Sequence, residues 1–291
     1  MGFTLIYKAT NTEPHLFRAF RYDHTKEEIW SLIVEDFCRS QRLDAQAFQQ
    51  VSEAGFNGES TQRLLNEYGL ASLPQLPDDP TKVTQAPVIT DLTELIALNS
   101  LLDQEHSLKF PYPRVLHKET FRNQHHGIDM LAYKEQQGNF SLYIVEVMAS
   151  AENAHPPKTV KDHYRQILPE TLDQERASRL LDDLRTIHAE AREEHDKEVL
   201  NGFIIVVLTG QLADHQAVVA TPVLIRPRGL FDEKDWKPFA ETTHNFEKAR
   251  ISSKVWFTSV ELLVGFSDLY NYLLSTLGSK GNNRLKENEV E

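Results

Sequence analysis

Two carboxylates stand in apolar surroundings near the middle of the chain. Asp129 follows Gly127 and Ile128 and opens a run of mostly apolar residues, and Glu146 ends the apolar stretch that begins at Phe140. Aspartate is disfavoured in strands, and a buried carboxylate is costly unless it is paired or bound to a metal ion. The placement of the two acids favours a shared site. Each has a structural alternative: Asp129 could cap a turn or pair with an arginine, and Glu146 could face solvent.

The chemistry open to such a pair is that of a hard divalent cation. Two carboxylates within a few ångströms of each other repel unless a cation neutralises them. Carboxylate oxygens are ligands that Mg²⁺ prefers, and Mn²⁺ accepts the same set. A metal ion held in this way orients a water molecule and makes it more acidic for attack on a phosphodiester. Asp129 and Glu146 therefore predict an Mg²⁺ site, with Mn²⁺ as a substitute, that supports phosphodiester hydrolysis.

A β-hairpin is the element that can bring the two acids together. Residues 127–134 and 140–148 each have the composition of a strand, and Gln137-Gly138-Asn139 supplies a turn between them. Side chains alternate between the two faces of a strand, so Glu146 and Met148 share a face. We expect the hairpin to place Asp129 beside Glu146.

The other elements follow from hydrophobic spacing, capping residues and proline positions. We expect helices over 25–38, 43–54, 60–70, 91–104, 156–168, 172–199 and 261–277, and further strands over 2–8, 203–208, 217–225 and 255–257. The run 203–208 is continuously apolar, as in a central buried strand. This order predicts an α/β protein with a mixed central sheet flanked by helices on both faces.

Domain boundaries are indicated by composition. The proline-rich segment 74–80 interrupts regular structure. We expect a mainly helical N-terminal region over 1–86, a core over 87–278, and a disordered tail over 279–291.

The hairpin and its neighbours resemble the PD-(D/E)XK nuclease superfamily. The resemblance is carried by Gly127-Ile128-Asp129 and, after the turn, by Ile144-Val145-Glu146-Val147-Met148. It implies a restriction-endonuclease-like fold in which Asp129 and Glu146 bind the metal ion. The superfamily usually draws a third carboxylate from the helix before the first strand, which makes Glu94 the candidate here and leaves Glu119 as a weaker one.

Met148 departs from the superfamily pattern, because it occupies the position of a lysine that stabilises developing charge. A thioether cannot supply that charge. Three interpretations stay open. Lys158 or Lys161 on the following helix supplies the ammonium, or the chain is a catalytically inactive binding module, or it is an inactivated variant.

The outline of the whole chain resembles the nuclease subunits of Hachiman anti-phage defence systems (HamA). The points of likeness are chain length, the helical N-terminal part, Pro113, Lys118 and the motif His126-Gly127-Ile128-Asp129, followed by Glu146 near mid-chain. The likeness implies a DNA substrate and a helicase partner.

Composition excludes several other classes. The net charge of −12 argues against a protein that coats nucleic acid through a generally basic surface. Cys38 is the single cysteine, which excludes an internal disulfide and a multi-cysteine zinc site. No apolar run is long enough for a membrane span, and the N-terminus does not resemble a signal peptide. We therefore expect a cytoplasmic protein without membrane association. An unrelated α/β protein with structural carboxylates is the remaining alternative.

Overall fold

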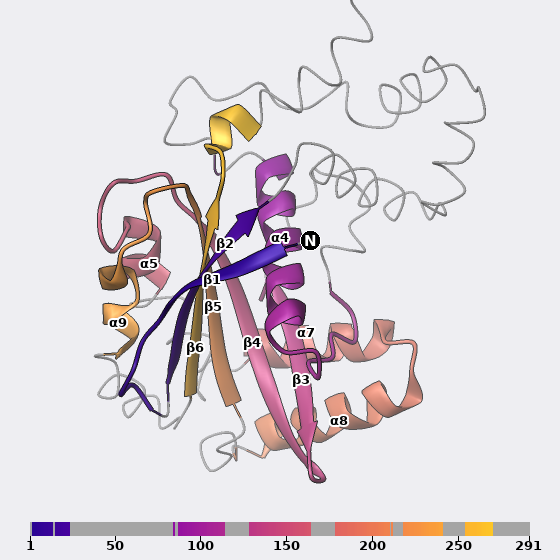
Figure 1. Ribbon diagram of the computed structural model, residues 1–291. Helices are drawn as coiled ribbons and strands as arrows, with labels where there is room; N and C mark the ends of the chain where they lie inside the picture. The colour runs from indigo at the N-terminus through magenta and orange to yellow at the C-terminus, as the bar shows by residue number, and fades with distance from the viewer. Residues whose placement is uncertain are drawn as a thin grey trace, which may run out of the picture.

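A six-stranded mixed sheet forms the centre of the molecule (Figure 1). The computed structural model describes residues 2–13, 15–23, 84, 87–113, 128–163, 178–209, 211, 218–240 and 254–269. The strands are β1 (Gly2–Lys8), β2 (Leu16–Asp23), β3 (Met130–Gln136), β4 (Asn139–Ala149), β5 (Val218–Pro227) and β6 (Lys254–Leu262). The helices expected over 25–38, 43–54 and 60–70 lie outside the described residues, as does the expected tail over 279–291.

The sheet has the order β1-β2-β6-β5-β4-β3. The four inner strands β2, β6, β5 and β4 are parallel, and an antiparallel hairpin closes each edge. The prediction of a mixed sheet is therefore confirmed. The strand predicted over 2–8 is confirmed as β1, and the hairpin predicted around Gln137-Gly138-Asn139 is confirmed as β3 and β4. The predicted strands over 217–225 and 255–257 correspond to β5 and to the first part of β6.

Two irregularities interrupt the strand pairing. Ile6 is an extra residue in β1, because Leu5 pairs with Phe20 while Tyr7 pairs with Ala19. Pro222 lies in the central strand β5, and pairing with β6 is absent between Ala220 and Val223. Proline has no N–H to donate to a neighbouring strand, which accounts for the gap.

Helices cover both faces of the sheet. The helix α4 (Pro87–Gln104) packs on one face, where Leu92, Leu95 and Ile96 belong to one apolar cluster. On the other face a second cluster joins the sheet to α5 (Lys158–Asp162), α7 (Ser178–Glu190), α8 (Glu194–Leu208) and α9 (Lys237–Ala240). Each face of the sheet is thus buried against helices, as an α/β layer architecture requires.

The prediction of a strand over 203–208 is wrong, because this run is the end of α8. Phe203 and Val207 are buried and lie four residues apart, whereas Ile205 and Leu208 are 53% and 57% exposed. One helical face therefore carries the burial. A short apolar run cannot be assigned to a strand or a helix from its composition alone, and the hydrophobicity of the exposed positions concealed the helical spacing.

The single helix predicted over 172–199 is also wrong in extent. The chain leaves the helical conformation after Glu190, and Glu193 has an extended backbone before α8 begins. Leu180, Leu184 and Ile187, spaced four and three residues apart, are buried on α7. The break allows α8 to turn back and pack against α7.

The predicted start of the last helix at Glu261 is wrong, because β6 continues to Leu262 and the helical turn begins at Phe266. β2 was not predicted at all. The helix predicted over 91–104 begins at Pro87, which suits proline since the first helical turn needs no N–H donor. The helix expected over 156–168 is present as α5, as far as the structure describes it.

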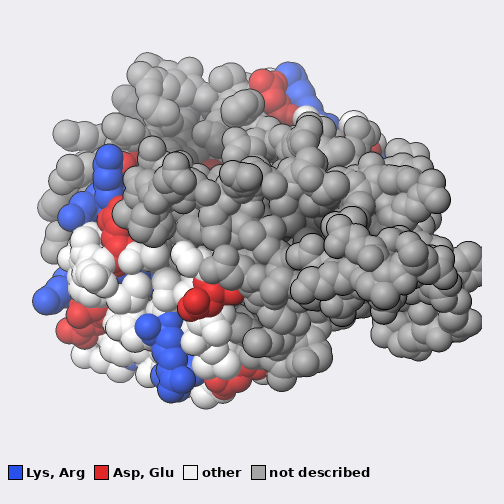
Figure 2. Space-filling view, turned by 90° about the horizontal axis from the view of Figure 1, so that it is seen from above, with Lys and Arg blue, Asp and Glu red and all other residues white. Residues whose placement is uncertain are grey.

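Within the described residues, none of the helices combines the length and the apolar character needed to cross a membrane. On the described part of the surface shown in Figure 2, Lys and Arg side chains are interspersed with Asp and Glu.

A buried ion pair fixes the loop between β4 and α5. The side chains of Arg226 and Asp235 are both fully buried, with Nη1 and Oδ2 2.7 Å apart. Arg226 Nη2 also donates to the backbone carbonyl of Glu152, and His155 Nδ1 lies 3.1 Å from Asp235 Oδ1. Removing one member of such a pair leaves an uncompensated charge in the interior.

We expect Asp235→Ala to lower the free energy of unfolding by about 3–5 kcal/mol, because Arg226 would then stay buried without its counter-charge. The matched control is Asp182→Ala, which removes an exposed partner of Arg185 on α7 and should cost less than about 1 kcal/mol. Urea denaturation measures both. Equal small losses for the two variants would contradict the structural role of the buried pair.

Candidate functional site

Asp129 lies immediately before β3, at the position that continues the hairpin register to Glu146. Met130 is the first residue of β3 to pair, and its partner is Val145. One residue before Met130 and one residue after Val145, the register therefore reaches Asp129 and Glu146. The Val147 N–H donates to Asp129 Oδ2 at 2.6 Å. Extending this register by one position puts Asp129 opposite Glu146, and the expectation that both carboxylates bind one metal ion stays a prediction.

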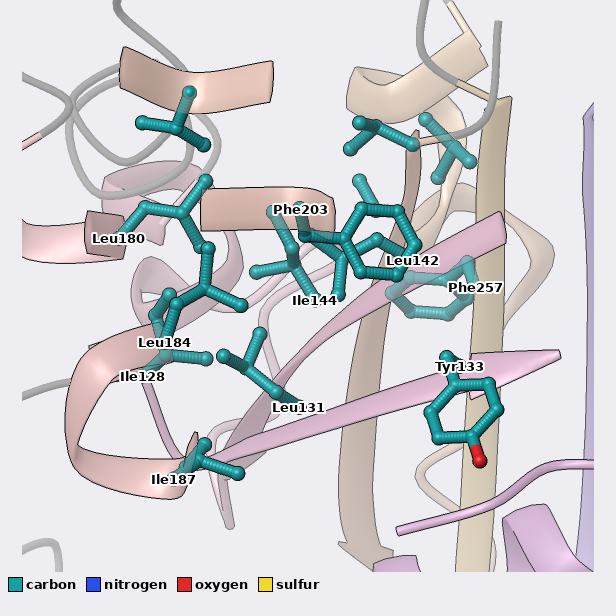
Figure 3. Packing of buried hydrophobic residues seen from close by; sticks show 14 of the residues in the cluster. Ile128, Leu131, Tyr133, Leu142, Ile144, Leu180, Leu184, Ile187, Phe203 and Phe257 are labelled. Carbon is teal, nitrogen blue, oxygen red and sulfur yellow. The ribbon is translucent and has the colours of Figure 1, made fainter. Parts of the chain in front are cut away.

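Glu146 lies on the face of the sheet that α5, α7 and α8 cover. It is 7% exposed, and Ile144 and Met148 on either side of it in the strand alternation belong to the apolar cluster of that face. Figure 3 shows Ile144 and Leu142 of β4 pointing into the layer between the sheet and the helices. Surroundings of this kind strengthen electrostatic interactions with a carboxylate because water does not screen them.

Met148 shares the face of Glu146, as predicted from strand alternation, and is 6% exposed. Its thioether packs among apolar side chains. Lys158 and Lys161 are both exposed on α5, whereas Val160 between them is buried in the cluster. The inward face of α5 is therefore apolar, and its two lysines lie on the solvent side.

Glu94 is buried on α4, the helix that packs on the opposite face of the sheet. Across the part of the chain that the structure describes, no group of three or more His, Cys, Asp or Glu side chains could hold a metal ion. The structure therefore does not bring Glu94 into one ligand group with Asp129 and Glu146, and its role as a third ligand stays a prediction. Lys118, Glu119 and His126 lie outside the described residues.

Two carboxylates nevertheless fit the donor chemistry of Mg²⁺. This ion commonly keeps several water ligands and takes only one or two carboxylates from a protein. Asp129 and Glu146 would hold it, and the Val147 N–H restricts the rotation of the Asp129 carboxylate.

Asp183 is a residue of the site region that sequence reasoning missed. It lies on α7, is 5% exposed, and its Oδ2 accepts a hydrogen bond from the Ile128 N–H at 2.9 Å. The signal that could have revealed it is its position between Leu180 and Leu184 on the apolar stripe of α7. A carboxylate on such a stripe needs a hydrogen-bond partner.

A groove on the described part of the chain lies elsewhere. It has a volume of about 750 Å³ and is lined by residues of the hairpin turn and α8, including Phe140, Ser141 and Phe203. Ser141 and Glu146 are five residues apart on β4, which corresponds to roughly 16 Å along a strand. The groove is therefore separate from the two carboxylates.

No family model matches the sequence, and no curated protein matches it.

We expect Mg²⁺ or Mn²⁺ to raise the melting temperature of the protein, because a ligand that binds only the folded state stabilises it. Asp129→Asn keeps a hydrogen-bond acceptor for Val147 and Glu146→Gln keeps the shape of the side chain, so both should remain folded and lose the shift. Differential scanning fluorimetry with and without metal measures this. An equal shift in both variants and the wild type would place metal binding elsewhere.

Proposed function

We propose that this chain is a metal-dependent DNA endonuclease subunit of an anti-phage defence system, acting with a helicase partner. The observation that carries the proposal is the register of the β3–β4 hairpin, which extends to Asp129 opposite Glu146 in an otherwise apolar part of the sheet. A shared cation offsets the repulsion between two such acids.

The chemistry follows from what the two carboxylates can hold. A bound Mg²⁺ or Mn²⁺ ion supplies an activated water and neutralises charge on the phosphodiester. Asp129 orients its carboxylate through the Val147 N–H, and Glu146 presents its carboxylate from the buried face of β4. These residues bind and orient the ion, and the apolar side chains around Glu146 limit the access of water to it.

A restriction-endonuclease-like core is part of the proposal. What supports it is the order of elements: α4 precedes the β3–β4 hairpin, α5 follows the acidic strand β4, and β5 pairs in parallel with β4. The proposed superfamily has a helix, an acidic hairpin and a further helix in this order.

DNA and a helicase are the proposed substrate and partner. The net charge of −12 and the mixed charges on the described part of the face in Figure 2 support a division of labour between this chain and its partner. A protein that binds DNA alone neutralises phosphates with a basic surface. A partner that holds the DNA would make such a surface on this chain unnecessary.

A second candidate function is a catalytically inactive subunit of the same fold that binds a partner protein or DNA. It is favoured by Met148, which places a buried thioether where the superfamily has a lysine, and by the solvent-facing lysines of α5. The two candidates differ in whether a positively charged side chain reaches the bound phosphodiester.

We expect the wild-type protein with Mg²⁺ to nick plasmid DNA, and Asp129→Ala or Glu146→Ala to abolish nicking while leaving the fold intact. Losing a metal ligand removes charge stabilisation worth several kcal/mol. Gel quantification of nicked plasmid, with Asp182→Asn as the control, measures the effect. Cleavage by both alanine variants at the wild-type rate would contradict the proposed site.

Three further variants test which side chain supplies the ammonium group that the superfamily takes from a lysine at position 148. Met148→Lys is expected to create or increase nicking if the chain is degenerate at this position, because residue 148 points to the face of Glu146. If an α5 lysine supplies the charge, Lys158→Ala or Lys161→Ala should reduce nicking instead. Since Met148 is buried, circular dichroism must show that Met148→Lys is folded. Silence of the wild type and all three folded variants on duplex and single-stranded DNA would favour the inactive subunit.

A further inference from the structure

Asp183 is a carboxylate on the apolar face of α7. Leu180, Leu184 and Ile187 of the same helix are almost fully buried in the cluster beneath the sheet, and Asp183 itself is 5% exposed. Burying a carboxylate is costly unless hydrogen bonds replace its hydration. The location of Asp183 therefore requires specific partners in the protein.

One partner is the backbone of the residue that precedes Asp129. The Ile128 N–H donates to Asp183 Oδ2 at 2.9 Å in a buried environment. A hydrogen bond to a charged acceptor is stronger than one between neutral groups. Figure 3 shows the Ile128 side chain among Leu180, Leu184 and Ile187 of α7. Ile128 is thus fixed to α7 through both its backbone and its side chain.

Ile128 and Asp129 precede the first pair of the β3–β4 ladder, Met130 and Val145. Ile128 is tied to α7 by Asp183, and Asp129 is tied to β4 through the Val147 N–H. Neighbouring Cα atoms are a fixed distance apart, so a movement of Ile128 is passed directly to Asp129.

We propose that Asp183 is a positioning residue, which holds the Asp129 carboxylate beside Glu146 by accepting the hydrogen bond of the Ile128 N–H. The relevance of this role to catalysis rests on the proposed function. The mechanical link from Asp183 to Asp129 does not.

The link is tested by amide hydrogen exchange of the intact protein, followed by NMR. The reporter is the Val147 amide, because Asp129 accepts its hydrogen bond and Asp183 does not. Asp183→Leu suits the apolar surroundings but removes the acceptor for Ile128. If Asp129 is released, exchange at Val147 should become about tenfold faster, the effect of losing one net hydrogen bond. A purely local role for Asp183 would change exchange at Ile128 alone.

Two controls separate the hydrogen bond from the charge. Asp183→Asn removes the charge and keeps an acceptor, so protection of Val147 should be retained. Asp182→Asn changes an exposed neighbour on α7 and should have no effect. Wild-type exchange at Val147 in folded Asp183→Leu would overturn the proposal. If Asp183→Leu does not fold, Asp183→Ala provides the same readout with a smaller side chain.

Binding of Mn²⁺, measured by titration calorimetry, connects the link to the metal site. If Asp129 is released from the Val147 N–H, a proposed metal ligand loses its outer hydrogen-bond partner. Such a loss typically weakens metal affinity by at least about tenfold. We expect that loss for Asp183→Leu and an affinity close to that of the wild type for Asp183→Asn. Equal weakening in both would mean that only charge matters and would overturn the positioning role. A wild type that binds no Mn²⁺ would overturn the proposed function, whereas the Val147 exchange would still decide this inference.

Discussion

The antiparallel register between β3 and β4 is the constraint on which the candidate site depends. Pairing of Met130 with Val145 puts Asp129 and Glu146 at matching positions. Side chains on a strand alternate with a period of two, so a slip of one residue would move every side chain of the slipped strand to the other face. The apolar clusters on the two faces oppose such a slip, because each accepts a different set of side chains from β4.

Charged side chains gather near the end of the sheet at which β4, β5, β6 and β2 finish. Arg226 of β5 and Arg21 of β2 both stand beside Glu261 of β6 in the register. Arg21 forms an ion pair with Glu261 at 3.2 Å, and Arg226 does so with Asp235. These pairs match a cation with an anion within the protein. Asp129 and Glu146 place two carboxylates at matching register positions, and the proposed metal site rests on this arrangement.

Much of the sheet could be predicted from the sequence because its signals are local. The hairpin is marked by a turn sequence between two runs of β-branched and aromatic residues, and Asp129 and Glu146 are conspicuous because acids are rare in such runs. The relation between the two acids needs only a hairpin, whose strands are neighbours in the sequence. The adjacency of the candidate residues was therefore within reach of sequence reasoning.

What could not be predicted depends on contacts between distant segments. The run 203–208 is apolar on both its buried and its exposed side, so only packing against α7 and the sheet decides that it is helical. The segment from Glu261 onward has the composition of a helix. Its first residue is held in β6 by Arg21 and Gly229, which lie in other parts of the chain. Asp183 and Ile128 are 55 residues apart. No local pattern reports such pairings.

The bulge at Ile6 has a consequence for how the protein behaves at high concentration. A regular outer strand offers its unpaired backbone groups to a second molecule and so promotes aggregation, and a bulge twists that strand out of alignment. β1 is one outer strand and carries the bulge. On the other outer strand, the Tyr133 N–H and carbonyl are occupied by Lys109. Both margins of the sheet are thereby poor templates for the addition of a strand from another copy.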